Sequence, residues 1–188
     1  MIRKSILFIF LLTASQFGIA QRIAIATKAI GTVEINKKVQ PGYNSLKAGT
    51  ILEDGDGIRT GSDGFVLIIF IDDKSQLKVK GDSELTISGK KIASAISKNV
   101  RMDNGTVRAQ VNKQRKGEFV IQSTTSVASV KGTDFWFIAN SEEGDMVIGL
   151  ERIVDLFNAI SGLNVDVTAG NTGTVSYTHL TLPTICSV

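Results

Sequence analysis

Apolar and polar residues alternate along much of this chain with a period of two. In the segment from Thr106 to Val111, for example, Val107, Ala109 and Val111 share one face. Such alternation is typical of strands with one buried face. It recurs over five short segments: Thr32 to Ile35, Gln76 to Val79, Glu84 to Ile87, Thr106 to Val111 and Glu118 to Ile121.

A continuous apolar run, Phe65 to Ile71, does not alternate, so we expect a central strand with both faces covered. Turn signals rich in glycine and aspartate separate the segments at short intervals, as in "DGDG" at Asp54 and "GSDG" at Gly61. Many short strands at this spacing predict an all-β fold, either β-solenoid-like or a sandwich.

At most one or two short helices fit the pattern. Lys91 to Lys98 is a weak candidate. The stretch from Leu150 to Ser161 is stronger, because its apolar residues recur at helical spacing and Gly162 follows as a stop signal. Periodicity alone favours a helix there.

The first twenty residues have the layout of a secretory signal peptide: Arg3 and Lys4, the apolar run Ile6 to Leu12, then small residues up to Ala20. That run is shorter than a membrane span, which needs about 20 apolar residues. We therefore expect residues 1–20 to be cleaved and the rest to be exported, to the periplasm or another extracytoplasmic site. No later segment is long and apolar enough to span a membrane.

The mature domain is almost neutral. Cleavage removes two of the 21 basic residues and none of the 18 acidic ones, so the net charge falls from +3 to +1. Binding to nucleic acid would call for a strongly basic domain or stripe, so we do not expect it.

The last residues of the chain resemble a sequence of foreign origin. Val175 to Thr184, "VSYTHLTLPT", resembles a translated adapter used in preparing sequencing libraries. We expect residues 175–188 to be non-native and the domain, residues 21–174, to be truncated there. This tail holds the only histidine and the only cysteine, so residues 21–174 offer neither thiol chemistry nor disulfides.

Two stretches resemble the FecR domain family. The first, "LKAGTILEDGDGIRTGSDGFVLIIFIDDKSQLKVKGDSELTI", has Gly55, Thr60, Gly61 and Gly64 at the family's turn positions. The second, "FVIQSTTSVASVKGTDFWFI", places Gly132 and Thr133 in the most specific part of the motif. The resemblance runs from about Gly31 to Gly170.

The chain departs from the family pattern in two places. Ser123 and Thr124 stand where the family usually has threonine and proline, and Arg152 replaces a usual glycine. The resemblance implies a strand at Ile153 to Asn158, where periodicity suggested a helix, and we adopt the strand.

Members of this family are best known as sensors that pass a signal from an outer-membrane receptor to a sigma factor. That mechanism uses a cytoplasmic segment and a transmembrane helix, whereas here a signal peptide precedes the domain, so we do not carry it over. The resemblance implies a non-enzymatic interaction or signal-sensing module in the bacterial envelope, whose partner is an envelope protein or polymer. The alternative is a secreted carbohydrate-binding or adhesin module, and the oligomeric state stays open.

Two groups of carboxylates are candidates for a metal site or a catalytic site. Asp54, Asp56 and Asp63 could suggest calcium, but the EF-hand spacing is incomplete and ordinary turns account for them. Asp72 and Asp73 are adjacent, and neighbouring strand residues point to opposite faces, so we expect them not to converge on one substrate. We predict no catalysis, metal or cofactor.

The expected interaction surface combines a basic band with an aromatic residue. Lys90, Lys91, Arg101 and Arg108 lie in a segment with a single aspartate, and they could attract an acidic partner. Trp136 stands between two phenylalanines and would face outward if these fill the core. A solvated surface of mixed charge is the alternative.

Overall fold

A computed structural model describes residues 21–92, 95–114, 117–176 and 180–185. Within these ranges the chain forms seventeen strands and no helix, which confirms the all-β prediction. No helix long and apolar enough to cross a membrane occurs in this part of the chain. The strands are β1 (Arg22–Ile30), β2 (Val33–Lys37), β3 (Gln40–Ser45), β4 (Ile51–Glu53), β5 (Asp56–Thr60), β6 (Phe65–Phe70), β7 (Gln76–Val79), β8 (Glu84–Ile92), β9 (Ala95–Gln110), β10 (Phe119–Gln122), β11 (Ser126–Val130), β12 (Asp134–Ala139), β13 (Asp145–Gly149), β14 (Ile153–Asn158), β15 (Asn164–Thr168), β16 (Asn171–Val175) and β17 (Leu180–Ile185).

Backbone pairing sorts these strands into two sheets. Sheet A has the order β4-β1-β6-β7-β9-β12-β13-β16-β17. Sheet B has the order β3-β2-β5-β8-β9-β10-β11-β14-β15, and its β9–β10 pair is parallel whereas the other pairs in both sheets are antiparallel. Strand β9, 16 residues long, belongs to both: it pairs with β8 in sheet B as far as Asn104, and with β12 in sheet A from Gly105 onward.

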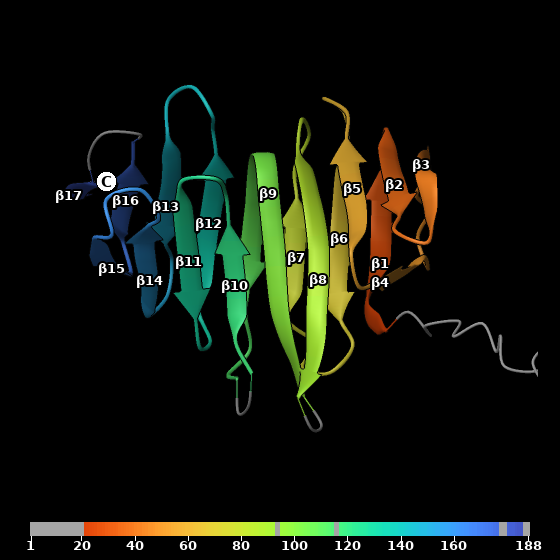
Figure 1. The fold of residues 1–188 in the computed structure, drawn as a ribbon, viewed down its shortest axis with the longest axis horizontal. Coiled ribbons are helices and arrows are strands. Elements are labelled where there is room, and N and C mark those ends of the chain that lie inside the picture. The colour runs from red at the N-terminus through yellow and green to blue at the C-terminus, as the bar shows by residue number, and fades with distance from the viewer. Residues whose placement is uncertain (1–20, 93–94, 115–116, 177–179, 186–188) are drawn as a thin grey trace, which may run out of the picture.

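From β6 onward the chain builds hairpins alternately in the two sheets. The β10–β11 and β14–β15 hairpins lie in sheet B, and the β12–β13 and β16–β17 hairpins lie in sheet A. Each later hairpin pairs with the preceding hairpin of its own sheet, β14 with β11 and β16 with β13. The strands lie across the long axis, with β1–β4 together at one end, and from β5 the chain advances broadly along that axis toward β16 at the other end (Figure 1). The fold is therefore a two-layered sandwich assembled stepwise, as a solenoid is.

Alternate side chains of the two sheets fill the space between them. Phe70 from sheet A meets Phe119 from sheet B edge to face, with ring centroids 5.3 Å apart. This is a favourable geometry for two aromatic rings. Phe135 and Phe137 of β12 are fully buried in the same core, so Trp136 between them faces outward, as expected.

Strand β6 lies inside sheet A, between β1 and β7. The expectation that both its faces are covered was correct for one face. Val66, Ile68 and Phe70 are buried, whereas the outward-facing Phe65, Leu67 and Ile69 are half-buried.

The structure corrects both helix candidates. Residues 91–98 belong to the end of β8 and the start of β9, with residues 93–94 outside the described part. In the second candidate, β14 confirms the strand that the family resemblance implied. Periodicity misled there because Ile153 and Phe157 are apolar residues on the outer face, while Val154 and Leu156 are buried on the inner face. Apolar residues on both faces of a strand can mimic helical spacing.

The family-motif residues of the first half shape close backbone approaches. A Cβ atom on Gly64 would lie 2.5 Å from the Thr32 carbonyl oxygen, so glycine is required there. The Thr60 hydroxyl donates to the Lys80 carbonyl at 2.7 Å and accepts the Ser83 N–H at 2.9 Å, which ties β5 to the turn before β8. Gly55 has a positive φ of 87°, and Gly61 packs beside the Thr32 side chain.

The motif in the second half joins two turns. Gly132 has a φ of 139°, which favours glycine, and the Thr133 hydroxyl donates to the Glu151 carbonyl. Arg152, the departure from the family pattern, has a positive φ of 51°, and its guanidinium donates to the Gly132 carbonyl at 3.0 Å. The conformation that glycine usually provides is thus adopted by an arginine with a hydrogen bond of its own.

The predicted signal peptide, residues 1–20, lies outside the described residues. The boundary expected after Thr174 falls within β16, and β17 pairs with β16. The non-native origin of residues 175–188 stays a prediction.

Candidate binding surface

A shallow groove crosses the outer face of sheet B. Thr86 and Ser88 of β8, Asn99, Arg101 and Asp103 of β9, and Gln122 of β10 line it, and its volume is about 540 Å³. The strand register explains why they meet: Arg101 lies opposite Thr86 on one side and opposite Gln122 on the other. Ser88 lies opposite Asn99 in the same way.

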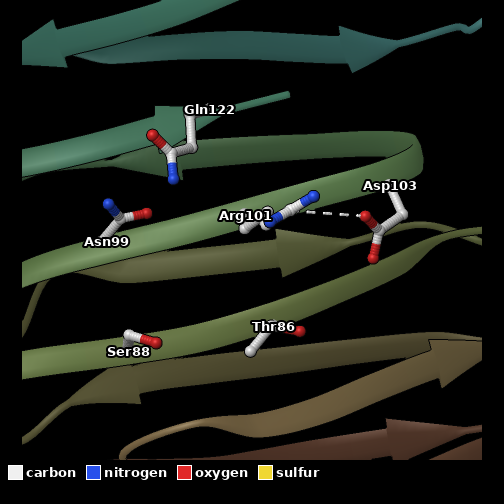
Figure 2. A pocket seen from close by; sticks show the side chains of 6 residues that line it. All are labelled: Thr86, Ser88, Asn99, Arg101, Asp103 and Gln122. Atoms are coloured by element: carbon white, nitrogen blue, oxygen red, sulfur yellow. Dashed lines mark ion pairs between the residues drawn. The ribbon is translucent and has the colours of Figure 1, made fainter. Parts of the chain in front are cut away.

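Arg101 stands at the centre of the groove, with the shorter side chains around it (Figure 2). Its guanidinium lies 3.7 Å from the Asp103 carboxylate, and both side chains are more than half exposed. An exposed ion pair of this length contributes little to stability, so Arg101 can turn to a ligand at small cost. The hydroxyl and amide groups beside it add both donors and acceptors of hydrogen bonds.

The groove is part of a longer row of residues that lie opposite one another across sheet B. The row consists of Tyr43, Asn36, Gly57, Thr86, Arg101, Gln122, Val127 and Phe157. At ordinary strand spacing these eight positions extend over roughly 30 Å. We call them the sheet B row.

Both ends of the sheet B row carry aromatic side chains. The Arg59 guanidinium lies 4.0 Å from the centre of the Tyr43 ring, and the Tyr43 hydroxyl donates to Glu84 at 2.6 Å. Phe157 is exposed at the other end. A second hollow of about 250 Å³ lies nearby, lined by Ser129, Val130, Lys131, Ile153 and Asp155.

The hydrogen bond to the Glu84 carboxylate is the main reason that the pKa of Tyr43 is raised above its ordinary value. The pKa of Arg59 is also raised, chiefly by its hydrogen bond to Glu34. These groups thus hold their ordinary charges at neutral pH, with the Tyr43 hydroxyl bonded to Glu84 and the Arg59 guanidinium bonded to Glu34.

The structure divides the predicted interaction surface between two sheets. Lys90, Lys91 and Arg101 lie on β8 and β9 in sheet B, and both lysines are exposed. Arg108 and Trp136 lie opposite each other in sheet A. The five residues therefore do not share one surface, because β9 passes from one layer to the other between Arg101 and Arg108.

The sheet A patch is already occupied by its own contacts. The Arg108 guanidinium makes two hydrogen bonds to Asp134, at 2.9 and 2.7 Å, and these raise the pKa of Arg108. The Lys80 ammonium lies 4.5 Å from the centre of the half-buried Trp136 ring. These contacts leave Trp136 and Arg108 less available to a partner than Arg101.

Sequence reasoning missed the uncharged residues of the groove, namely Thr86, Ser88, Asn99 and Gln122. Charges and aromatic rings stand out in a sequence, whereas uncharged polar residues are common on exposed strands and give no signal of their own. Their outward positions in alternating segments were a usable signal, but the pairing of β8, β9 and β10 was needed to bring them together.

Asp72 and Asp73 correct a further prediction. Both carboxylates converge on the Lys98 ammonium, at 2.8 and 2.9 Å. The two residues do not point to opposite faces of a strand, because they lie in the turn after β6. Lys98 itself is fully buried.

The three aspartates considered for calcium have other partners. Asp54 pairs with Lys38 at 3.3 Å and Asp56 with Lys37 at 2.6 Å, while Asp63 accepts the Thr32 N–H at 3.1 Å. This hydrogen bond lowers the pKa of Asp63. No group of three or more potential metal ligands was found in the described part of the chain.

Comparison with known proteins identifies structures with a similar fold. A search of curated proteins returned no match. Two crystal structures, at 2.50 and 1.65 Å resolution, of a "putative anti-sigma factor" from Parabacteroides distasonis ATCC 8503 are similar, with TM-scores of 0.58 and 0.56 and 12% sequence identity. Each comparison covers 69% of this chain but only 59% of the solved chain. This likeness supports the fold.

The family comparison is more specific. The family described as FecR protein matches residues 56–152, just over half of the chain. The matched region begins at β5 and ends just before β14, so it contains the groove and the Lys98 contacts. The chain therefore belongs to the FecR family.

Proposed function

We propose that this protein is an exported, non-enzymatic FecR module of the bacterial envelope that binds another envelope protein through the outer face of sheet B. Family membership supports an interaction or signal-sensing role. The anti-sigma description of the similar solved structures points in the same regulatory direction. The signal-peptide pattern of residues 1–20 supports an extracytoplasmic location.

The sheet B row is the observation that carries the proposal. It places arginine, tyrosine and phenylalanine on one continuous face, with hydroxyl and amide groups between them. Aromatic residues and arginine are enriched where proteins bind one another, and polar groups around them set the register.

Binding to an envelope extract tests the proposal. The mature protein is immobilised, and captured proteins are compared between the wild type and the double variant Arg101→Ala, Asn99→Ala. We expect the double variant to bind the captured protein at least about tenfold more weakly, because the centre of the groove is lost. Its unfolding midpoint should stay that of the wild type, since both side chains project outward.

Variants on sheet A provide the control. Arg108→Ala removes an arginine and Trp136→Ala removes an aromatic ring on the other layer, and we expect binding to persist. Loss of binding in the sheet A variants with full binding in the sheet B variant would contradict the assignment. It would restore Trp136 as the contact residue.

A carbohydrate-binding role is a second candidate, and the lining of the groove favours it. Hydroxyl, amide, guanidinium and carboxylate groups lie within one shallow hollow, and together they match the donors and acceptors of a sugar. Equilibrium binding to isolated envelope polysaccharide, in parallel with the protein capture, distinguishes the two. Binding to polysaccharide alone that falls in the Arg101→Ala, Asn99→Ala variant would replace the protein-partner proposal.

A further inference from the structure

Lys98 occupies an unusual position for a lysine. On β9 it lies on the same face as Ile96 and Val100, which are buried, so its side chain points between the two sheets. The side chain is completely inaccessible to solvent. Burying an ammonium group is costly unless opposite charges and hydrogen-bond acceptors surround it, and here Asp72 and Asp73 do so.

The two carboxylates are held differently. Asp72 Oδ2 accepts hydrogen bonds from the Lys98 ammonium and from the Ile96 N–H, both at 2.8 Å. Its other oxygen, Oδ1, is buried and makes no hydrogen bond among the described residues. One oxygen of Asp72 is thus polarised by a backbone donor, and the other is uncommitted.

Asp73 is held as an anion. It accepts the Ser75 N–H at 2.9 Å and a hydrogen bond from the Gln114 amide, besides the Lys98 ammonium. Burial by itself would raise the pKa of Asp73, but the hydrogen bonds from Lys98, Gln114 and Ser75 outweigh it, and the pKa lies below its ordinary value. Asp73 is thus a carboxylate, and the proton acceptor role rests on its position, because its Oδ2 lies 2.9 Å from the Lys98 ammonium.

The surroundings favour uncharged products. The Lys98 ammonium lies 5.7 Å from the centre of the Phe70 ring, which packs against Phe119. In such an apolar setting, conversion of an ammonium and a carboxylate to a neutral amide removes two buried charges.

We propose that Lys98 and Asp72 condense into an intramolecular amide bond. Asp73 accepts a proton from the Lys98 ammonium, and the free amine attacks Cγ of Asp72. The Ile96 N–H stabilises the negative charge that develops on Oδ2. After the attack the nitrogen loses a second proton, Asp73 passes both protons to Oδ1, the Cγ–Oδ1 bond breaks, and Oδ1 leaves as water. The sum is one ammonium and one carboxylate converted to one amide and one water, with Asp73 again a carboxylate.

The chain contains a matched pair that should not react. The Lys37 ammonium lies only 2.6 Å from Asp56 Oδ2, and the Asp56 side chain is 2% exposed, compared with 9% for Asp72. Lys37, however, is 30% exposed, and both oxygens of Asp56 accept backbone N–H groups, from Lys38 and from Glu53. The second carboxylate beside the Lys37 ammonium is that of Glu53, 3.6 Å away, which is further than Asp73 lies from the Lys98 ammonium. We expect this pair to remain an ion pair.

Mass spectrometry of the purified protein tests the proposal. We expect the intact mass to lie about 18 Da below the value calculated for the same chain, the mass of one water. After denaturation and digestion with trypsin, the peptide Thr60 to Lys74 should be joined to the peptide Ile92 to Arg101, because trypsin does not cleave after an acylated lysine. Cleavage after Lys37 should be complete.

Other digestion products would overturn the proposal. Unmodified Lys98 after prolonged incubation at neutral pH would do so, and so would a link to Asp73. A mass loss without a branched peptide would also do so, since it indicates a cyclised aspartate.

Two variants separate chemistry from folding. Lys98→Arg keeps the positive charge but cannot form the amide, so the branched peptide should vanish while the circular dichroism spectrum stays that of strands. Asp73→Asn keeps both reacting groups but removes the proton acceptor, and the link should form at least about tenfold more slowly. An unchanged rate in Asp73→Asn would contradict the role given to Asp73.

Discussion

Two buried clusters in this sandwich compensate charged side chains in different ways. In the Lys98 cluster, two aspartates from the turn after β6 surround a fully buried ammonium. In the Asp145 cluster, a buried carboxylate at the start of β13 accepts hydrogen bonds from three hydroxyls of the β10–β11 turn. Those of Thr125 and Ser126 are 2.5 and 2.6 Å long, and the third comes from Ser123.

The difference lies in what each arrangement permits. Hydroxyl groups rotate freely and can satisfy a carboxylate without any cation, so the Asp145 cluster needs only hydrogen-bond donors. The Lys98 cluster has two negative charges against one positive charge, and it leaves one carboxylate oxygen without a partner among the described residues. A buried polar group with an unmet requirement is a place to look for chemistry, whereas a fully satisfied one indicates structure.

The largest effect should follow from removing the cation. Lys98→Met leaves two carboxylates close together with no ammonium, and it also abolishes the proposed amide. We expect the free energy of unfolding to fall by about 5 kcal/mol, measured by urea denaturation. Adding Asp72→Leu should recover about 2 kcal/mol, because it removes one of the uncompensated charges. A loss below about 1 kcal/mol in Lys98→Met would show that the cluster is not closed to water.

A smaller loss is expected at the hydroxyl cluster. Asp145→Ala deprives three hydroxyls and the Asn140 N–H of their acceptor, and we expect a loss of about 3 kcal/mol in the same assay. Asp145→Asn keeps one carbonyl acceptor and should lose about half as much. Equal losses in both variants would indicate that the negative charge, rather than the number of acceptors, stabilises the turn.

The smallest expected effect is on the dependence of stability on pH. While Lys98 is an ammonium ion, the pKa of Asp73 is lowered in the folded protein, so its contribution to stability is present above the pKa of an unfolded aspartate, near 4. It is lost as the pH falls through the lower folded value. Urea denaturation between pH 5 and about 2 should therefore show a shallower loss of stability in Asp73→Asn than in the wild type. Parallel curves would contradict the assigned shift.

The strand pattern was largely readable from the sequence. Gln76 to Val79 was predicted with the bounds that β7 has, because each polar residue there alternates with a buried apolar one. The stretch after Leu150 was ambiguous for a physical reason: β14 exposes Ile153 and Phe157 on one face and buries Val154 and Leu156 on the other, so apolar residues occur at helical spacing.

The arrangement of the sheets was not readable in this way. Alternation says which side chains point inward, but not to which layer a strand belongs. Arg101 and Arg108 are seven residues apart on one strand, yet they lie in different sheets because β9 changes partners near Gly105. Alternation could not show that the predicted basic and aromatic residues are divided between two sheets, and their part in binding stays a prediction.

Lys98 shows a second limit. A lysine in a strand is assigned to the solvent by its charge, and its burial follows only from two aspartates that precede it by about 25 residues. Such a contact depends on the crossing of the β6–β7 turn over the start of β9, which no local pattern encodes.

The continuity of β9 through both sheets has a mechanical consequence. Two layers joined only by side-chain packing can slide past each other by exchanging contacts, but here a single stretch of backbone runs from one layer into the other. Sliding would require rotation about the backbone bonds at Gly105, where the chain lies so close to Ser83 that a larger residue would collide with it. This backbone connection therefore resists sliding of the two sheets past each other at the middle of the molecule.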